Sequence, residues 1–234
     1  MPDTDALLAS LEWFAAALTD PYAASDVLHM LVQNAGVVIG ASGAGVLLVR
    51  QGRYVYTTSS RASVAALERV VEKHQLGPCV EAGNSRRAVA VKDLRAGAYL
   101  AKFPAYVAEA RRRHIRAVAC VPMLAGETSI GALGLYERDC RDWSTDDLRV
   151  AAILAKLASS YVVHAKELDE HRRLTGQLQH ALNSRIVIEQ AKGVVAVQRG
   201  VGIDQAFELM RKRARDNNER LRDVCAEVVS HHQG

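Results

Sequence analysis

Charged and small side chains recur at helical spacing between residues 184 and 199. One helix face would carry Arg185, Glu189, Lys192 and Ala196, which follow one another at intervals of four, three and four residues. Ala191 and Gly193 flank Lys192 and are small, which would let this helix approach another backbone closely. Cations on such a face can contact phosphate groups. The same pattern also fits a solvated charged stripe beside a tight helix crossing.

A second basic run lies between residues 211 and 222. Within it, Arg211, Arg215 and Asn218 follow i, i+4, i+7 spacing and align on one side of a helix. Their stripe borders Phe207, which we expect in a core, and 181–234 holds no other Phe, Trp or Tyr. Base stacking on aromatic side chains is therefore not expected. The segment carries nine Lys and Arg against seven Asp and Glu, a net of only +2, so a solvated face is the alternative.

The cysteines do not form a metal or dithiol motif. They are Cys79, Cys120, Cys140 and Cys225, far apart in the chain and without Cys-x-x-Cys or zinc spacing. Cys79 follows a Gly-Pro turn, where we favour a buried structural cysteine over a reactive thiol. Only Cys79 and Cys120 could meet as a nucleophile and its resolving partner. The sequence contains no Walker loop, zincin motif, nucleophile elbow or kinase signature, so we predict no enzyme, no metal and no bound cofactor.

Composition places the chain among globular proteins. Of 234 residues, 49% are apolar and 24% are charged, and the formal net charge is +4. This mild charge permits an anionic partner without requiring one. The N-terminus lacks a secretory pattern, and apolar runs are interrupted well before the ~18 residues of a membrane span. We expect a cytoplasmic protein with reduced thiols and no membrane contact.

The first 145 residues mix helical and strand patterns. Apolar spacing predicts helices over about 5–18 (stopping at Asp20-Pro21), 25–40, 63–74 and 104–113, and strands over 45–49, 54–58, 88–92, 117–121 and 130–136. Turn signals at Gln51-Gly52-Arg53 and Ala125-Gly126-Glu127 join neighbouring strands. The fold class expected is α+β, with a mostly antiparallel sheet flanked by helices.

A long helix is predicted after residue 144. Ser144 can cap it with Asp147 three positions on, and no proline follows Pro122. Spacings of three and four define a heptad seam whose apolar members are Leu154, Leu157, Tyr161, Leu168, Leu178 and Leu182, with His and Thr in its middle. A parallel coiled-coil homodimer is the favoured interpretation, and a helix lying back on its own sheet is the alternative. Gly176 could be a joint.

Three amphipathic helices are predicted in the last fifty residues. The first covers 184–199, the second follows Gly202, and the third carries Leu221, Val224, Cys225 and Val228 on one side. Each apolar stripe needs the others, so we expect a small bundle. The predicted organisation is an α+β domain at 1–145, a linker and coiled-coil helix at 146–180, and a three-helix bundle at 181–234.

Several ordered blocks in 180–230 resemble the ANTAR domain of bacterial RNA-binding transcription antiterminators. They are Leu182–Ala196, Asp204–Phe207, Arg213–Asn218 and Leu221–Val224. The resemblance implies a dimer that binds RNA carrying two neighbouring hairpins, one per protomer, and so prevents a terminator from folding. We expect the RNA-binding residues to be Arg185, Glu189, Gln190, Ala191, Lys192, Gly193, Arg211, Arg215 and Asn218.

The upstream region 20–165 resembles a GAF sensor domain. The matching features are Gly77-Pro78-Cys79, the strand before Lys92-Asp93-Leu94, and Val121-Pro122 followed by Ile130–Tyr136. Lys102-Phe103-Pro104 departs from the Arg-Trp-Pro that sensors paired with ANTAR often carry, which could alter a pocket rim. The resemblance implies an unidentified small ligand in this domain.

These observations predict a signal-responsive RNA-binding antitermination regulator in which the sensor gates RNA binding. One alternative is a ligand-gated dimeric sensor whose C-terminal bundle binds a protein. Another is a GAF-type methionine sulfoxide reductase that uses cysteines. Salt dependence separates the first two, because phosphate contacts weaken steeply with salt. The reductase alternative requires that treatment with an oxidant lowers the number of free thiols.

Overall fold

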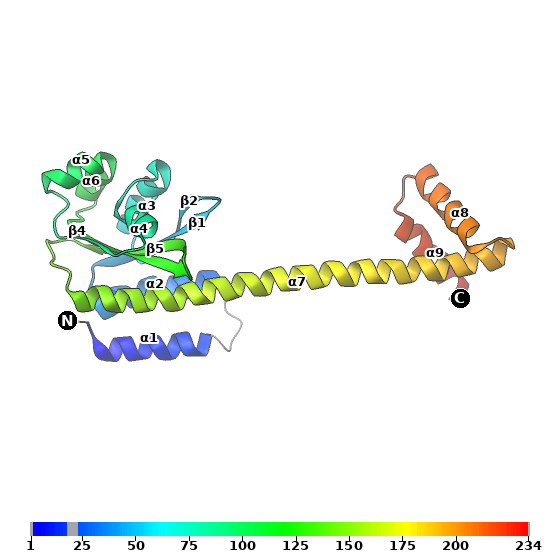
Figure 1. The fold of residues 1–234 in the computed structure, drawn as a ribbon, viewed down its shortest axis with the longest axis horizontal. Helices are drawn as coiled ribbons and strands as arrows, with labels where there is room; N and C mark the ends of the chain where they lie inside the picture. The colour runs from blue at the N-terminus through cyan, green and yellow to red at the C-terminus, as the bar shows by residue number, and fades with distance from the viewer. Residues whose placement is uncertain (1, 18–22, 234) are drawn as a thin grey trace. The chain divides into compact units, whose positions relative to one another are not determined.

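The computed structural model describes residues 2–17 and 23–233 (Figure 1). The chain divides into two compact units, Met1–Lys166 and Glu167–Gly234. Each unit has its own core, and each is described here by itself.

Unit 1 is built on a five-stranded antiparallel sheet with strand order β2-β1-β5-β4-β3. The strands are β1 (Gly43–Arg50), β2 (Arg53–Ser59), β3 (Val89–Val91), β4 (Ala117–Ala125) and β5 (Thr128–Glu137). Gln51 and Gly52 both have positive φ, which suits the tight turn between β1 and β2. Gly126, also at positive φ, turns β4 into β5. Both predicted hairpins are therefore confirmed.

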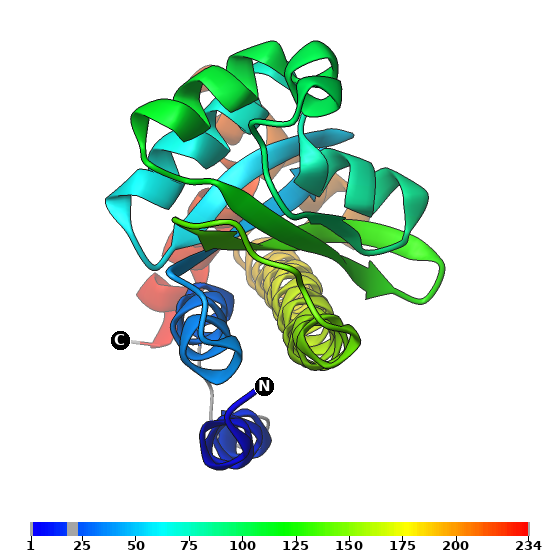
Figure 2. The same ribbon diagram turned by 90° about the vertical axis from the view of Figure 1, so that its left-hand side faces the viewer.

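Helices cover both faces of this sheet (Figure 2). On one face lie α2 (Ala24–Ile39) and the first turns of α7 (Thr145–Arg199), with α1 (Thr4–Ala17) packed against α2. On the other lie α3 (Ala62–His74), α4 (Pro78–Ser85), α5 (Gly97–Lys102) and α6 (Pro104–Arg112). The strands alternate between the two cores: Val46 and Leu48 face one, and Leu47 faces the other.

The structure adds helices α4 and α5 to those predicted. The predicted helix at 104–113 is α6, and α1 covers 4–17 of the predicted 5–18. Leu18 and the stop signal at Asp20-Pro21 lie outside the described residues.

The predicted start of the long helix is confirmed by a reciprocal cap. The Asp147 N–H donates to Ser144 Oγ at 3.1 Å, and the Ser144 N–H donates to Asp147 Oδ2 at 3.1 Å. Helix α7 then continues for 55 residues and passes through Gly176. The prediction of a separate first bundle helix beginning near Ser184 is wrong, because this segment is the end of α7.

The seam residues of α7 fall into two environments. Leu154 and Tyr161 are buried in the core of unit 1, and Leu157 packs against it. Beyond residue 166 the seam members are open: Leu168, Leu178 and Leu182 are 57%, 62% and 54% exposed. The first half of the stripe therefore lies on its own sheet, and the second half is exposed among the described residues of unit 2.

Unit 2 is a three-helix bundle formed by the end of α7, α8 (Ile203–Asp216) and α9 (Leu221–Gln233). Its core contains Ala191, Val195, Ala206, Met210 and Cys225. Gly200, with φ +63°, ends α7, and the Val201 N–H donates to the Ala196 carbonyl at 3.1 Å, which satisfies an end carbonyl. The bundle agrees with the predicted fold class.

Helix α7 also contains an 18-residue stretch that meets the length and composition of a membrane span. Its apolar residues Ala151, Leu154, Ala155 and Ala158 are buried in the core of unit 1. Core helices of soluble proteins meet the same criteria, so the stretch is weak support for a membrane span.

Candidate functional site

Two cations from different helices meet at one aromatic ring in unit 2. Lys192 Nζ of α7 lies 5.6 Å from the centroid of Phe207, and Arg211 Cζ of α8 lies 5.7 Å from it. Both distances fall within the range of cation–π attraction. The ring is half-buried against the bundle core. Phe207 therefore holds Lys192 and Arg211, which are nineteen positions apart, beside one another.

Each of these cations is also paired with a carboxylate one turn earlier on its own helix. Lys192 Nζ lies 2.9 Å from Glu189 Oε2, and Arg211 Nη1 lies 2.8 Å from Glu208 Oε1. Both carboxylates are more than half exposed, whereas the Lys192 side chain is only 16% exposed, so the Arg211–Glu208 pair is the one that solvent screens more fully. Each pair gives its cation a second contact besides the Phe207 ring.

Helix α8 and the turn after it form a shallow depression of about 390 Å³. Its lining residues are Arg211, Ala214, Arg215, Asn218, Glu219 and Leu221. Three of the predicted residues, Arg211, Arg215 and Asn218, are thus brought together along it. Ala214 and Leu221 give it an apolar part, and Asn218 has the left-handed φ of +55° that ends α8. The arrangement can offer cations to phosphates and an amide to a base edge.

The remaining predicted residues occupy different positions. Arg185 and Gln190 are exposed, and Glu189 pairs with Lys192. Ala191 is fully buried in the bundle core, so its small size serves packing. Gly193 is different: a Cβ placed there would meet nothing within 4 Å. Among the described residues, no tight helix crossing explains the glycine.

The sequence reasoning missed several contacts that shape this surface. The Lys192–Phe207–Arg211 contact depends on how α7 packs against α8, which spacing within one helix does not reveal. Arg213 of α8 pairs with Glu227 of α9, and Arg222 Nη1 lies 3.1 Å from His180 Nε2. Two of the basic side chains therefore link helices of the bundle. No spacing pattern in the sequence signals the contact of Lys192 and Arg211 with Phe207.

A cluster of polar side chains is buried in the core of unit 1. Glu68 of α3, Cys79 of α4, Tyr106 of α6, Cys120 of β4 and Tyr136 of β5 are all at most 2% exposed. The Tyr136 hydroxyl donates to Glu68 Oε1 and lies 3.7 Å from Cys79 Sγ. Glu68 falls in the apolar stripe of α3, between Leu67 and Val71, and that position was the sequence signal for it.

Burial shifts the ionisation of this cluster. It raises the pKa of Glu68 to about 7, although the hydrogen bond from Tyr136 acts in the opposite direction. Burial also raises the pKa of the Cys79 and Cys120 thiols. Cys79 is buried as predicted, and a raised pKa leaves little nucleophilic thiolate at neutral pH. Within the part of the chain that the structure describes, no three His, Cys, Asp or Glu side chains are placed to hold a metal ion.

Solved structures similar to this chain share the fold of unit 1. A GAF domain from an Acinetobacter phosphoenolpyruvate-protein phosphotransferase aligns with TM-score 0.53 and 13% identity, covering 73% of this chain and 99% of that one. A GAF domain from Synechocystis in its photoproduct state aligns with TM-score 0.53 and 17% identity, covering 64% and 99%. A GAF domain/HD domain protein from Geobacter sulfurreducens gives 0.52 and 16%, covering 63% and 97%. No curated protein matches the chain.

The family matches agree with this fold and extend it. Residues 24–162, more than half of the chain, match the GAF domain, so the chain belongs to the GAF family of sensor domains. Residues 176–229 match the ANTAR domain. The protein is thus a GAF–ANTAR two-domain regulator, in which a sensor domain precedes an RNA-binding domain.

Proposed function

We propose that the protein is a cytoplasmic, homodimeric transcription antiterminator, not an enzyme, in which the state of the GAF domain controls the binding of the ANTAR bundle to paired RNA hairpins. The observation that carries the proposal is the surface formed by Lys192, Phe207, Arg211, Arg215 and Asn218. Lys192 of α7 and Arg211 of α8 both lie against the Phe207 ring, and Arg211 also lines the depression together with Arg215 and Asn218.

The chemistry of this surface suits a hairpin loop. Loops expose unstacked bases and a bent phosphate backbone, which proteins read with cations, amides and small apolar areas. Within the described residues the Arg215 guanidinium has no ion-pair partner, and Lys192 and Arg211 have only exposed carboxylates to exchange for phosphate. The wall formed by Ala214 and Leu221 is the apolar area next to them.

Dimerisation supplies the link between sensor and bundle. The open seam of α7, Leu168, Leu178 and Leu182, is the apolar stripe that a second copy would cover. Paired helices would place one bundle near each hairpin of the RNA. A signal in the GAF domain acts by shifting the register or separation of these helices, which requires differential affinity for the two arrangements.

The test is binding of the full chain to an RNA with two adjacent hairpins at low and moderate salt. Arg215→Ala should weaken binding about tenfold and reduce the salt slope by about 1. Lys212→Ala is the matched control, because it removes the same charge from α8 without touching the depression. An equal loss of RNA affinity in both variants would show that the charge of α8 matters and that the depression itself does not. If the chain bound no RNA at either salt concentration but bound another protein with an affinity that did not depend on salt, the protein-partner alternative would be favoured.

A further inference from the structure

The positive charge of the chain is concentrated in two segments of unit 1. Residues 61–75 and 104–116 together carry seven Lys and Arg against three Asp and Glu, a net of +4, which equals the formal net charge of the whole chain. The bundle segment 181–234 reaches only +2 over almost twice the length. A local excess of this size attracts anions. Six of the seven cations are arginines: Arg61, Arg69, Arg111, Arg112, Arg113 and Arg116.

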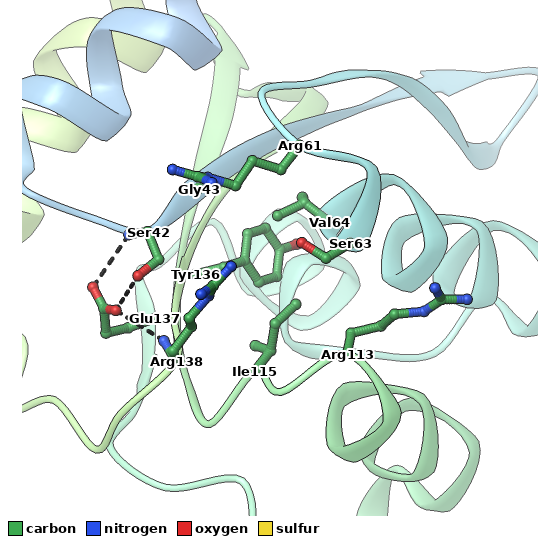
Figure 3. Close-up of a pocket in the computed structure, with 10 residues that line it drawn as sticks. All are labelled: Ser42, Gly43, Arg61, Ser63, Val64, Arg113, Ile115, Tyr136, Glu137 and Arg138. Atoms are coloured by element: carbon green, nitrogen blue, oxygen red, sulfur yellow. Dashed lines mark hydrogen bonds between the residues drawn. The ribbon is translucent and has the colours of Figure 1, made fainter.

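The two segments lie side by side on the sheet. The first contains α3 and the second contains α6, and both helices cover the sheet face opposite α2 and α7 and share one core (Figure 2). Arg61 precedes α3, Arg113 ends α6, Arg138 follows β5, and all three line one small depression. Figure 3 shows Arg61 and Arg113 extending to opposite sides, with Arg138 between them. These three residues are called the arginine patch below.

The patch lies on the surface and does not form a cavity. The depression between the three side chains holds about 10 Å³, which is room for a single water. An anion larger than water would therefore contact the guanidinium groups from outside. The side chain of Arg113 is 46% exposed, and Arg61 and Arg138 are exposed as well.

Little negative charge is available nearby to neutralise the patch. Glu109 lies 2.7 Å from Arg113 and 3.5 Å from Arg112, so one carboxylate serves two cations. Glu137, which lines the same depression, accepts hydrogen bonds from the backbone N–H and the hydroxyl of Ser42. The other two arginines of the patch have no ion-pair partner among the described residues. They are therefore open to an anionic partner.

The composition of this face suits phosphate groups better than a lipid surface or an apolar protein partner. In the two segments, which the structure describes completely, no large apolar side chain is exposed. Membrane surfaces and protein interfaces are usually bound with aromatic or aliphatic anchors. Arginine presents parallel N–H donors that match the oxygens of a phosphate, which lysine does not. Six arginines against one lysine thus favour a chain of phosphodiesters.

We propose that the arginine patch is a second RNA contact, which binds phosphates of the strand that flanks the paired hairpins. The contact reads no base sequence, because phosphate contacts position a nucleic acid without specifying it. The inference rests on the proposed function and adds a contact from the sensor domain to those of the bundle. Because both contacts belong to one chain, each raises the effective concentration of RNA for the other.

The first experiment compares a two-hairpin RNA with the same RNA extended at both ends by uridine tracts. The wild type should bind the extended RNA more tightly and with a steeper salt dependence. Arg61→Ala/Arg138→Ala should abolish this gain and lower the slope of log affinity against log salt by about 1.4, because each single-stranded phosphate contact contributes about 0.7. The matched control is Arg50→Ala/Arg53→Ala, which removes two exposed arginines beside the β1–β2 turn. No gain from the tracts, or equal losses in both double variants, would overturn the proposal.

A second experiment lets the patch and the proposed function fail separately. A hairpin-free polyuridine should bind the wild type weakly and lose most of its affinity in Arg61→Ala/Arg138→Ala. Arg211→Ala/Arg215→Ala should instead lose the hairpins and keep most of the polyuridine affinity. If the patch variant binds both RNAs as the wild type does, the patch is refuted and the bundle surface stands. If only the patch variant loses RNA, the patch stands and the bundle surface is refuted.

A third experiment separates charge from the geometry of the guanidinium groups. Arg61→Lys/Arg138→Lys keeps both charges, so it should retain the salt slope and still bind the extended RNA severalfold more weakly than the wild type. All patch variants should melt with the wild type, because the replaced side chains are exposed. Binding of the wild type to phosphatidylserine vesicles, with no gain from the uridine tracts, would assign the patch to a membrane surface and overturn the proposal.

Discussion

Gly45 and Gly134 lie directly opposite one another on the neighbouring strands β1 and β5. The pair forms a bare area of the sheet on which Glu68, Cys79 and Tyr136 rest. A side chain on either glycine would meet these groups at less than 3.0 Å. The arrangement of the sensor core therefore depends on the absence of two Cβ atoms.

Gly134→Ala should consequently destabilise unit 1. The new methyl would lie 2.5 Å from the Tyr136 hydroxyl oxygen and 2.9 Å from Cys79 Sγ, so the tyrosine ring must shift. Overpacking of this kind costs about 1–3 kcal/mol. The measurement is urea unfolding followed by the fluorescence of Trp13 and Trp143, which both lie in unit 1. Gly176→Ala, in open space on α7, is the control and should leave this transition unchanged. An unaltered midpoint for Gly134→Ala would contradict the packing described.

The ionisation of Glu68 should make the sensor domain less stable as the pH rises. Burial raises the pKa of Glu68 from 4.5 to about 7, so the folded state binds more protons than the unfolded state between these values. Stability therefore falls as the pH increases from about 4.5 to 7 and changes little from this group above that. Each unit of pKa difference corresponds to about 1.4 kcal/mol.

The neighbours of Glu68 do not titrate in that range. The pKa values of Cys79, Tyr106, Cys120 and Tyr136 are all raised by burial from values already above neutrality. Urea unfolding at pH 5.5, 6.5 and 7.5 measures the slope, and Glu68→Gln should remove its largest part. A wild type and variant with parallel profiles would show that Glu68 is already ionised in the folded protein.

The sequence predicted the parts of the fold that depend on local patterns. Both hairpins follow from short turns with glycine, and the start of α7 follows from Ser144 and Asp147. Helix α4 was missed because its pattern is set by tertiary packing. Its Gly83 lies under the Tyr54 ring, where a Cβ would be 2.0 Å from the hydroxyl oxygen. Because glycine disfavours helices, the sequence of this short segment indicates a turn unless the packing of Tyr54 on Gly83 is known.

The same distinction applies to the candidate site. Arg211 and Arg215 share one face of α8, so spacing alone predicted that they align. Asn218 lines the same depression, but it lies in the turn after α8 with a left-handed φ and not on the helix face that spacing predicted. The contact of Lys192 with Phe207 requires the packing of α7 on α8, and the approach of Cys79 to the strand pair Gly134–Cys120 requires the packing of α4 on the sheet. Neither is encoded by the spacing of residues within one element.

Leu178→Glu should convert the proposed dimer into monomers. Leu178 is 62% exposed on the open part of the α7 seam, and a charge there would have to be buried against the same residue of a second copy. Sedimentation equilibrium measures the change, and binding to a two-hairpin RNA should weaken with it. Leu76→Glu, at a leucine of unit 1 that is 56% exposed, is the control. A wild-type chain that sediments as a monomer at all concentrations would refute the coiled-coil proposal.

Phe207→Leu should separate the positioning of the cations from their charge at the proposed RNA surface. Leucine keeps apolar contact with the bundle core, so the cost in stability should stay below about 1.5 kcal/mol. The variant loses the ring that holds Lys192 and Arg211 beside each other, each contact being worth about 0.5–1 kcal/mol. RNA affinity should fall severalfold with the salt slope unchanged, because both cations remain. Phe103→Leu is the matched control, since Lys102 lies 5.2 Å from the Phe103 ring in unit 1, and it should leave RNA affinity unaltered. If Phe207→Leu binds RNA as the wild type does, the ring serves only the core and the two cations act independently.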